Sequence, residues 1–228
     1  MKRALLNISA FILLLFACNK NDTSPAGGEH PPAEEWLLSK LTRIDVESRD
    51  TLVAYPVFEE NKLAKIMESD VVTRAFEYTG NNIIRINESE AYYDVIYNAE
   101  HKISEVRWKS TIYKLTWENE NVKSMTTFNV YNEDTTQGST KNYTYGNKKI
   151  ALKDNCMWLC SPLSFELLSF NNLVKQETVF AGEVHSRDTY EYKFNEKDLL
   201  VEQKVRSEQL INDPSVSNRV ITFSYTKK

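Results

Sequence analysis

The sequence predicts an all-β protein whose strands form a single antiparallel β-meander of repeated hairpins. Three observations support this fold class. A short pattern of aromatic, turn and apolar residues recurs along the chain, and bulky and polar residues alternate with period two beside it. The 228 residues also include 12 Tyr, 10 Phe and 4 Trp against only 6 Gly, a balance that favours strands over flexible linkers.

Each unit of the recurring pattern has an aromatic residue that ends one strand and an apolar residue that begins the next. Four residues separate the two in Phe58–Leu63, Tyr78–Ile83, Trp117–Val122, Tyr145–Ile150 and Phe194–Leu199. Tyr97–Ile103 has one residue more, Phe170–Val174 has one fewer, and Tyr225 ends the chain in the same role. Because Asn, Asp and Gly tolerate the dihedral angles of tight turns, each unit is a predicted hairpin.

Alternation assigns the flanking side chains to the two faces of the sheet. Tyr190, Tyr192 and Phe194 share one face, as do Leu199, Val201 and Val205 in the following strand. Glu191, Lys193, Glu202 and Lys204 take the opposite, charged face.

Some apolar pairs do not fit a regular strand, because their members are three residues apart and should lie on opposite faces. These pairs are Leu63/Ile66, Ile83/Ile86, Ile103/Val106 and Val122/Met125. Either a bulge follows each turn, or part of the second face is covered.

Residues 40–47 and 51–58 add two strands, which brings the total to about 14–16 short strands. Short loops between consecutive strands require antiparallel pairing, since parallel strands need long crossovers. So large a sheet curls under its own twist. We therefore expect the meander to curve strongly into a barrel or half-barrel with an aromatic-rich interior.

The N-terminus has the pattern of an export signal. Lys2 and Arg3 precede a short apolar run that ends at Cys18, and the run is too short for a comfortable membrane span. The segment Leu-Phe-Ala-Cys at residues 15–18 resembles a bacterial lipobox. The resemblance implies that residues 1–17 are removed and that Cys18 is lipidated. Residues 18–35, rich in Pro, Gly and polar residues, then form a disordered tether before a β-meander domain at 36–228.

The repeat unit resembles the YD (RHS) repeat, although most units lack the turn glycine. Lipobox, length and meander together resemble uncharacterised Bacteroidetes lipoproteins with a porin-like domain. This resemblance implies an exported protein that is lipid-anchored to the outer membrane, on the periplasmic side or at the cell surface. It implies no catalytic residues. The charged face with Glu191 and Lys193 would be rejected by lipid, so we expect porin-like shape rather than a membrane-spanning barrel.

The sequence offers no constellation for catalysis. His30, His101 and His185 lie in the tether or near turns, without metal-ligand spacing, and no nucleophile motif is present. We therefore expect no metal, no cofactor and no enzymatic activity. The formal charge of −4 and the lack of a basic run argue against nucleic acid as a partner. Thr51 and Thr135 lie in short motifs that resemble Bacteroidetes O-glycosylation sites.

Residues 154–168 interrupt the repeat with the most apolar stretch of the mature chain. One interpretation is a plug at one end of the curved sheet. The other is a lid or ligand surface in which Met157, Trp158 and Leu159 face an aromatic cleft with Tyr190, Tyr192 and Phe194. Cys156 and Cys160 enclose three residues and either form a local disulfide on a compact turn or remain free thiols.

Three function classes follow, in order of preference. The first is a membrane-anchored binding or adaptor module for a glycan, a peptide or an envelope protein, because binding needs only shape and aromatic side chains. The second is a carrier or sensor of an apolar ligand held in the aromatic interior. The third is a hydrolase, which would need catalytic residues that the sequence does not reveal.

Overall fold

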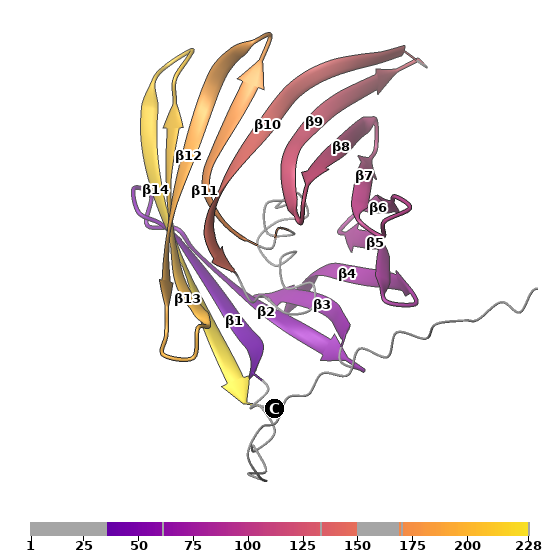
Figure 1. Cartoon of the computed structure of the whole chain (residues 1–228). Coiled ribbons are helices and arrows are strands. Elements are labelled where there is room, and N and C mark those ends of the chain that lie inside the picture. Colours follow the sequence, from indigo (N-terminus) through magenta and orange to yellow (C-terminus); the bar gives the residue numbers. More distant parts are fainter. Residues whose placement is uncertain (1–35, 61, 133, 150–168, 170, 228) are drawn as a thin grey trace, which may run out of the picture. The chain divides into compact units, whose positions relative to one another are not determined.

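Fourteen antiparallel strands close into a barrel in the computed structural model, which describes residues 36–60, 62–132, 134–149, 169 and 171–227 (Figure 1). The strands are β1 Trp36–Asp45, β2 Thr51–Glu59, β3 Lys62–Glu68, β4 Val71–Thr79, β5 Asn82–Glu88, β6 Ala91–Tyr97, β7 Ile103–Trp108, β8 Thr111–Glu118, β9 Asn121–Tyr131, β10 Asp134–Lys149, β11 Asn171–Phe180, β12 Glu183–Phe194, β13 Leu200–Gln209 and β14 Ser215–Lys227.

Every strand pairs with its neighbours in the sequence, and β1 pairs with β14 to close the barrel. The predicted antiparallel meander is therefore confirmed, and of the two predicted shapes the closed barrel is the one observed. Closure places Leu41 of β1 opposite Phe223 of β14, and both side chains are buried. The cyclic order leaves no open sheet edge among the described strands.

A β-bulge explains the apolar pairs that are three residues apart. Between β2 and β3 the pairing passes from Val57 with Lys65 to Phe58 with Leu63, so Ala64 has no partner. The extra residue turns Leu63 and Ile66 to the same face, where both are fully buried. The same bulge occurs wherever a repeat aromatic meets its partner, with these extra residues: Ser39, Ala64, Ile84, Ser104, Lys123, Val174 and Val201.

The structure corrects two details of the predicted repeat. Leu200, not Leu199, faces Phe194 and is buried, while Val201 is the bulged residue. Tyr145 is not followed by a tight turn at 146–149, because β10 continues to Lys149 and Tyr145 pairs with Leu173. Residues 171–173 likewise lie in β11 rather than in a turn. The barrel therefore contains seven units rather than eight.

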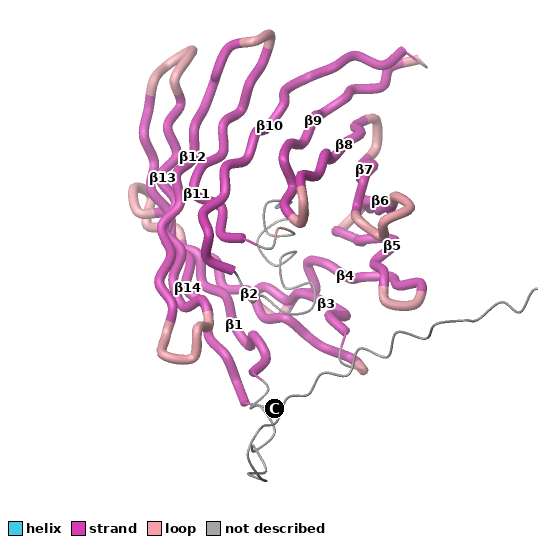
Figure 2. The backbone as a smooth tube through the Cα atoms, viewed as in Figure 1, coloured by secondary structure: helices cyan, strands magenta, loops and turns pink. Residues whose placement is uncertain are grey.

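The two ends of the barrel differ, and we name them by the turns that they carry. The proximal end holds Trp36, Lys227, the end of β10 at Lys149, the start of β11 at Asn171, the turn between Glu59 and Lys62, and the turns at 80–81, 98–102, 119–120 and 195–199. The distal end holds the turns at 46–50, 69–70, 89–90, 109–110, 181–182 and 210–214, and the turn between Tyr131 and Asp134. Figure 2 shows these loops at the two ends of the strands.

Most of the apolar core lies on the inner face of the proximal half. It is built from the paired residues beside the bulges, such as Ile83 with Ile86 and Ile103 with Val106. In two units the residue three positions after the apolar residue is glutamine instead of an apolar residue. These residues are Gln176 and Gln203, and both side chains are buried. The amide of Gln176 donates to Asp188 and that of Gln203 donates to Tyr192, so these buried polar groups are hydrogen-bonded.

The outer face is charged, as the sequence predicts. Glu191 pairs across the strands with Lys204, and Lys193 with Glu202, on the face opposite to buried Val205. Ion pairs such as Arg85 with Asp94, at 2.8 Å, lie on the outside of other strands. Among the residues that the structure describes, no helix has the length and apolar character to span a membrane. The predicted signal, Cys18, the tether and the insert at 154–168 lie outside the described residues.

Candidate functional site

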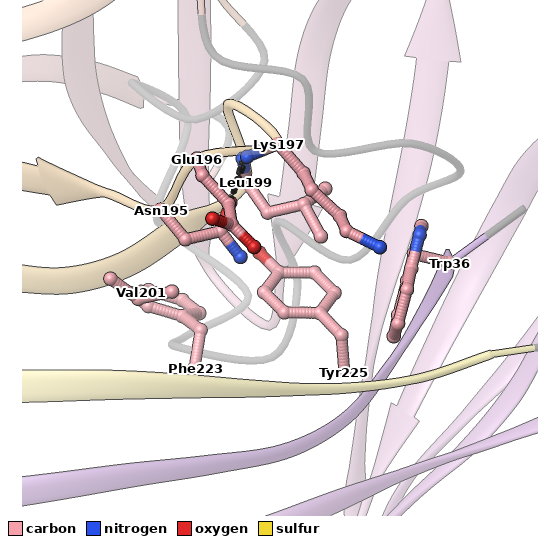
Figure 3. A pocket seen from close by; sticks show the side chains of 8 residues that line it. All are labelled: Trp36, Asn195, Glu196, Lys197, Leu199, Val201, Phe223 and Tyr225. Carbon is pink, nitrogen blue, oxygen red and sulfur yellow. Dashed lines mark hydrogen bonds between the residues drawn. The ribbon is translucent and has the colours of Figure 1, made fainter. Parts of the chain in front are cut away.

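A pocket of about 380 Å³ lies at the proximal end, where the start of β1 pairs with the end of β14 (Figure 3). It is lined by Trp36, Asn195, Glu196, Lys197, Leu199, Val201, Phe223 and Tyr225. These residues come from the start of β1, from the turn between β12 and β13 with the first residues of β13, and from the end of β14. We call this the proximal pocket.

The turn that forms one wall of the proximal pocket is held by Asn195. Its side-chain oxygen accepts hydrogen bonds from the backbone N–H groups of Lys197 and Leu199, at 2.9 and 3.0 Å. Asp198 adopts a left-handed conformation with φ of 57°, which a short polar residue tolerates. The Asn that follows the repeat aromatic is therefore a turn-capping residue, and Asn98 does the same after Tyr97.

Aromatic rings form the opposite wall. The hydroxyl of Tyr225 donates to the backbone carbonyl of Leu200 at 2.9 Å, which fixes the orientation of its ring. The ammonium of Lys197 lies 4.3 Å from the centroid of the Trp36 ring, within the range of a cation–π interaction. Figure 3 shows the Lys197 side chain reaching toward the space between Tyr225 and Trp36.

This combination of groups suits a ligand with both apolar and polar surfaces. Three aromatic rings offer flat faces for stacking, while Asn195, Glu196 and Lys197 offer polar groups on the neighbouring turn. The volume falls within the range of small-molecule sites, about 300–1,000 Å³. The pocket can thus hold a ligand by stacking and hydrogen bonding.

The structure places the predicted aromatic cleft residues beside the proximal pocket, not in its lining. Tyr190, Tyr192 and Phe194 lie on the inner face of β12 as predicted, and all three are half-buried against the core. The rings of Tyr192 and Phe194 are 6.4 Å apart, and the Lys148 ammonium lies 3.9 Å from the Phe194 ring. Their predicted partners Met157, Trp158 and Leu159, together with Cys156 and Cys160, lie outside the described residues.

Sequence reasoning missed the contributions of Trp36 and of the 195–199 turn to a pocket. The sequence carries part of the signal, because Asn195 follows a repeat aromatic and Tyr225 is itself a repeat aromatic. Thr51 and Thr135 are both exposed, at the start of β2 and near the start of β10. Their glycosylation stays a prediction.

A second group of polar and aromatic side chains lies on the inner face toward the distal end. The Glu88 carboxylate accepts a hydrogen bond from Arg74 at 2.9 Å and another from the Tyr93 hydroxyl at 3.1 Å. The Tyr93 ring stacks on Trp108, with centroids 5.8 Å apart. Burial raises the pKa of Tyr93, and the neighbouring Glu88 raises it further. Within this group the positive charge of Arg74 balances the negative charge of Glu88, which is typical of a structural cluster.

A groove of about 440 Å³ lies on the outer wall of β12 to β14. Its lining includes Lys204, Arg206, Glu191 and Val220. Arg206 pairs with Glu208 at 2.9 Å and Lys204 approaches Glu202 at 4.0 Å, so these two cations are locally neutralised. Within the described part of the chain, no group of three or more His, Cys, Asp or Glu residues is arranged to hold a metal ion.

No protein-family model matches the chain, and no curated protein matches it. Among solved structures, the chain is similar to a porin-like protein from Bacteroides uniformis ATCC 8492, with 10% sequence identity and a TM-score of 0.53, over 83% of this chain and 98% of that chain. A porin-like protein from Bacteroides vulgatus ATCC 8482 has the same identity and coverage, with a TM-score of 0.44. At this identity the first likeness shows the fold alone: the chain shares an antiparallel β-barrel with a porin-like protein.

Proposed function

We propose that the protein is a membrane-anchored lipoprotein of the cell envelope, whose barrel is a non-catalytic module that binds a glycan in the proximal pocket. The observation that carries this proposal is the lining of that pocket. The rings of Trp36 and Tyr225 stand beside the polar turn that Asn195 holds in shape. Sugar rings present C–H faces that stack on aromatic side chains and hydroxyl groups that bond to polar ones.

The anchor is supported by the N-terminal sequence. Lys2, Arg3, the apolar run and Cys18 have the order of a lipoprotein signal. A tether of residues 19–35 spans at most about 60 Å when fully extended, at roughly 3.3–3.6 Å per residue. The outer face of the barrel supports an anchored rather than a spanning protein. Arg85, Asp94, Glu191 and Lys204 lie on that face, and charges facing the middle of a bilayer are costly.

Calorimetric titration of the mature protein with a panel of neutral and acidic oligosaccharides tests glycan binding. We expect at least one oligosaccharide to bind, and Trp36→Ala to weaken its affinity about tenfold or more. Tenfold corresponds to about 1.4 kcal/mol, which is within reach of one lost aromatic stacking contact. Lys197→Met, which removes only the ammonium above Trp36, separates ligands that need this charge from ligands that need the rings alone.

Tyr131→Ala is the matched control, because Tyr131 is 79% exposed at a distal turn and far from the pocket in the strand order. Thermal unfolding by circular dichroism verifies that each variant remains folded. If no oligosaccharide binds, or if Trp36→Ala binds as the wild type does, the glycan proposal is wrong. Saturable binding of fatty acids without any oligosaccharide binding would instead identify a carrier of apolar ligands.

A further inference from the structure

Exposed apolar side chains concentrate at the distal end of the barrel. Twelve large hydrophobic residues are exposed in the described part of the chain, and nine of them lie within two residues of a distal turn. These nine are Ile44, Val46, Val71, Val72, Tyr92, Tyr131, Phe180, Leu210 and Val216. Single exposed apolar residues are ordinary on a protein surface, whereas their concentration in one region indicates a contact surface.

Four of these residues lie at three loops that are neighbours in the barrel, and we call them the distal strip: Val46, Phe180, Leu210 and Val216. The loops are neighbours because β11 to β14 and β1 are consecutive in the barrel. The backbone N–H of Val46 donates to the carbonyl of Asn218, two residues from Val216 on the same strand face. The N–H of Leu210 donates to the carbonyl of His185, whose ring contacts Phe180 edge-on at 5.6 Å.

The distal end is also strongly acidic. The described residues of the distal turns, with one flanking residue on each side, contain ten acidic and two basic residues. The same definition gives seven acidic and three basic residues at the proximal turns, so the net charges are −8 and −4. Arg74 neutralises one of the distal acids, Glu88. Glu183 and Asp213, beside the distal strip, have no ion-pair partner among the described residues and are exposed.

We propose that the distal strip and the acidic residues around it form a docking surface for a protein whose contact region is basic around at least one apolar side chain. Charge selects this partner. A second copy of the chain would carry the same acidic residues, and anionic lipid and nucleic acid would be repelled. The position of the described termini is consistent with docking at the distal end. Trp36 and Lys227, the first and last described residues, both lie at the proximal end.

The longest strands surround this surface. β10, β12 and β14 have 16, 12 and 13 residues, whereas β3 to β8 have 6 to 9. Figure 1 shows β9 to β14 rising as a tall wall beside the shorter strands. Phe180, Leu210 and Val216 lie at or beside the distal turns of this wall, and Val46 lies lower, beside Asn218 of β14.

Site-specific photocrosslinking in the native cell tests the proposal. A photoreactive amino acid replaces Val216 in the full-length chain, and in a matched control it replaces Ile84, which is 40% exposed and is the extra residue of a proximal bulge. We expect a protein adduct at position 216 and none at 84. The captured protein is then identified, purified and titrated against the barrel at several salt concentrations.

Variants decide whether the captured protein uses this surface. We expect Leu210→Ser with Val216→Ser to weaken binding about tenfold or more, and Glu183→Gln with Asp213→Asn to weaken binding and reduce its salt dependence. The control pair Ile84→Ser with Glu120→Gln makes the same chemical changes at the proximal end and should have no effect. The proposal is wrong if no adduct forms at position 216 or if an equal adduct forms at position 84. It is also wrong if the distal substitutions leave the affinity for the captured protein unchanged. Unchanged melting temperatures show that the variants are folded.

Discussion

The hydroxyl of Tyr78 donates a hydrogen bond of 2.9 Å to the backbone carbonyl of Leu63, immediately before the bulge at Ala64. A bulge interrupts the regular ladder of backbone hydrogen bonds, and a buried carbonyl without a partner costs free energy. Tyr78 provides a donor and links its own hairpin to the preceding one. Four further bonds of this kind follow around the barrel: Tyr97 to Ile83, Trp117 to Ile103, Tyr145 to Val122 and Tyr225 to Leu200.

Replacing Tyr78 by phenylalanine should destabilise the barrel without changing its fold. The variant keeps the ring but removes the bond to the Leu63 carbonyl, so we expect the free energy of unfolding to fall by about 0.5–1.5 kcal/mol. Equilibrium unfolding in urea measures the change. Tyr131→Phe is the control, since Tyr131 is 79% exposed and the loss of its hydroxyl should have little effect on the free energy of unfolding. Equal effects of the two substitutions would contradict a role for the repeat aromatic at the bulge.

The opposite substitution should stabilise the protein at Phe194. Phe194 occupies the position in its own unit that Tyr78 occupies in another. In the preceding unit the aromatic residue is Tyr145 and the apolar residue is Leu173. Phenylalanine has no hydroxyl to donate to the Leu173 carbonyl. We expect Phe194→Tyr to raise the free energy of unfolding by about 0.5–1.5 kcal/mol in urea. Phe128→Tyr, on the outer face of β9, is the matched control. A destabilised Phe194→Tyr variant would show that this unit is built differently.

The fold was predictable because its repeat is local. Aromatic residue, turn and apolar residue lie within about seven residues, and a spacing of three between Leu63 and Ile66 indicates either a bulge or a covered second face. The assignment of Leu199 to the inner face failed because period two was continued through a bulge at Val201. The sequence predicts an eighth unit at Phe170, because residues 150–168 separate Tyr145 from Leu173 in the sequence, although the two are paired in the barrel.

The candidate site was less predictable, because its walls meet only through barrel closure. Trp36 opens the described chain and Tyr225 lies near its end, and they share the proximal pocket because β1 pairs with β14. No local pattern links these residues. Tyr190, Tyr192 and Phe194 could be assigned to one face from alternation alone, but alternation does not reveal which inner residues surround an open space.

Substitution of Cys18 tests the anchor. If the protein is a lipoprotein, Cys18→Ala should yield a soluble or uncleaved precursor, because the acylated residue and the cleavage motif are lost together. Detergent phase partitioning with mass spectrometry of the mature N-terminus measures the outcome. Cys156→Ala is the control, which should partition as the wild type does. A cleaved Cys18→Ala protein that still enters the detergent phase would rule out anchoring through this residue.

High pH should weaken the barrel through its buried tyrosines. Burial raises the pKa of Tyr93 above the ordinary 10.0, and the Glu88 carboxylate beside its hydroxyl raises it further. The unfolded chain therefore releases this proton at a lower pH than the folded one does. The stabilising contribution is complete below about pH 10 and declines as the pH rises above it. Burial also raises the pKa of Tyr97 and of Tyr113, so several groups add to the effect.

We expect the free energy of unfolding in urea to fall above about pH 10, and that of Tyr93→Phe to fall less steeply than that of the wild type over this range. Tyr131→Phe should keep the wild-type slope. Parallel curves for Tyr93→Phe and the wild type would mean that Tyr93 ionises equally in the folded and unfolded chains, which is incompatible with its burial beside Glu88.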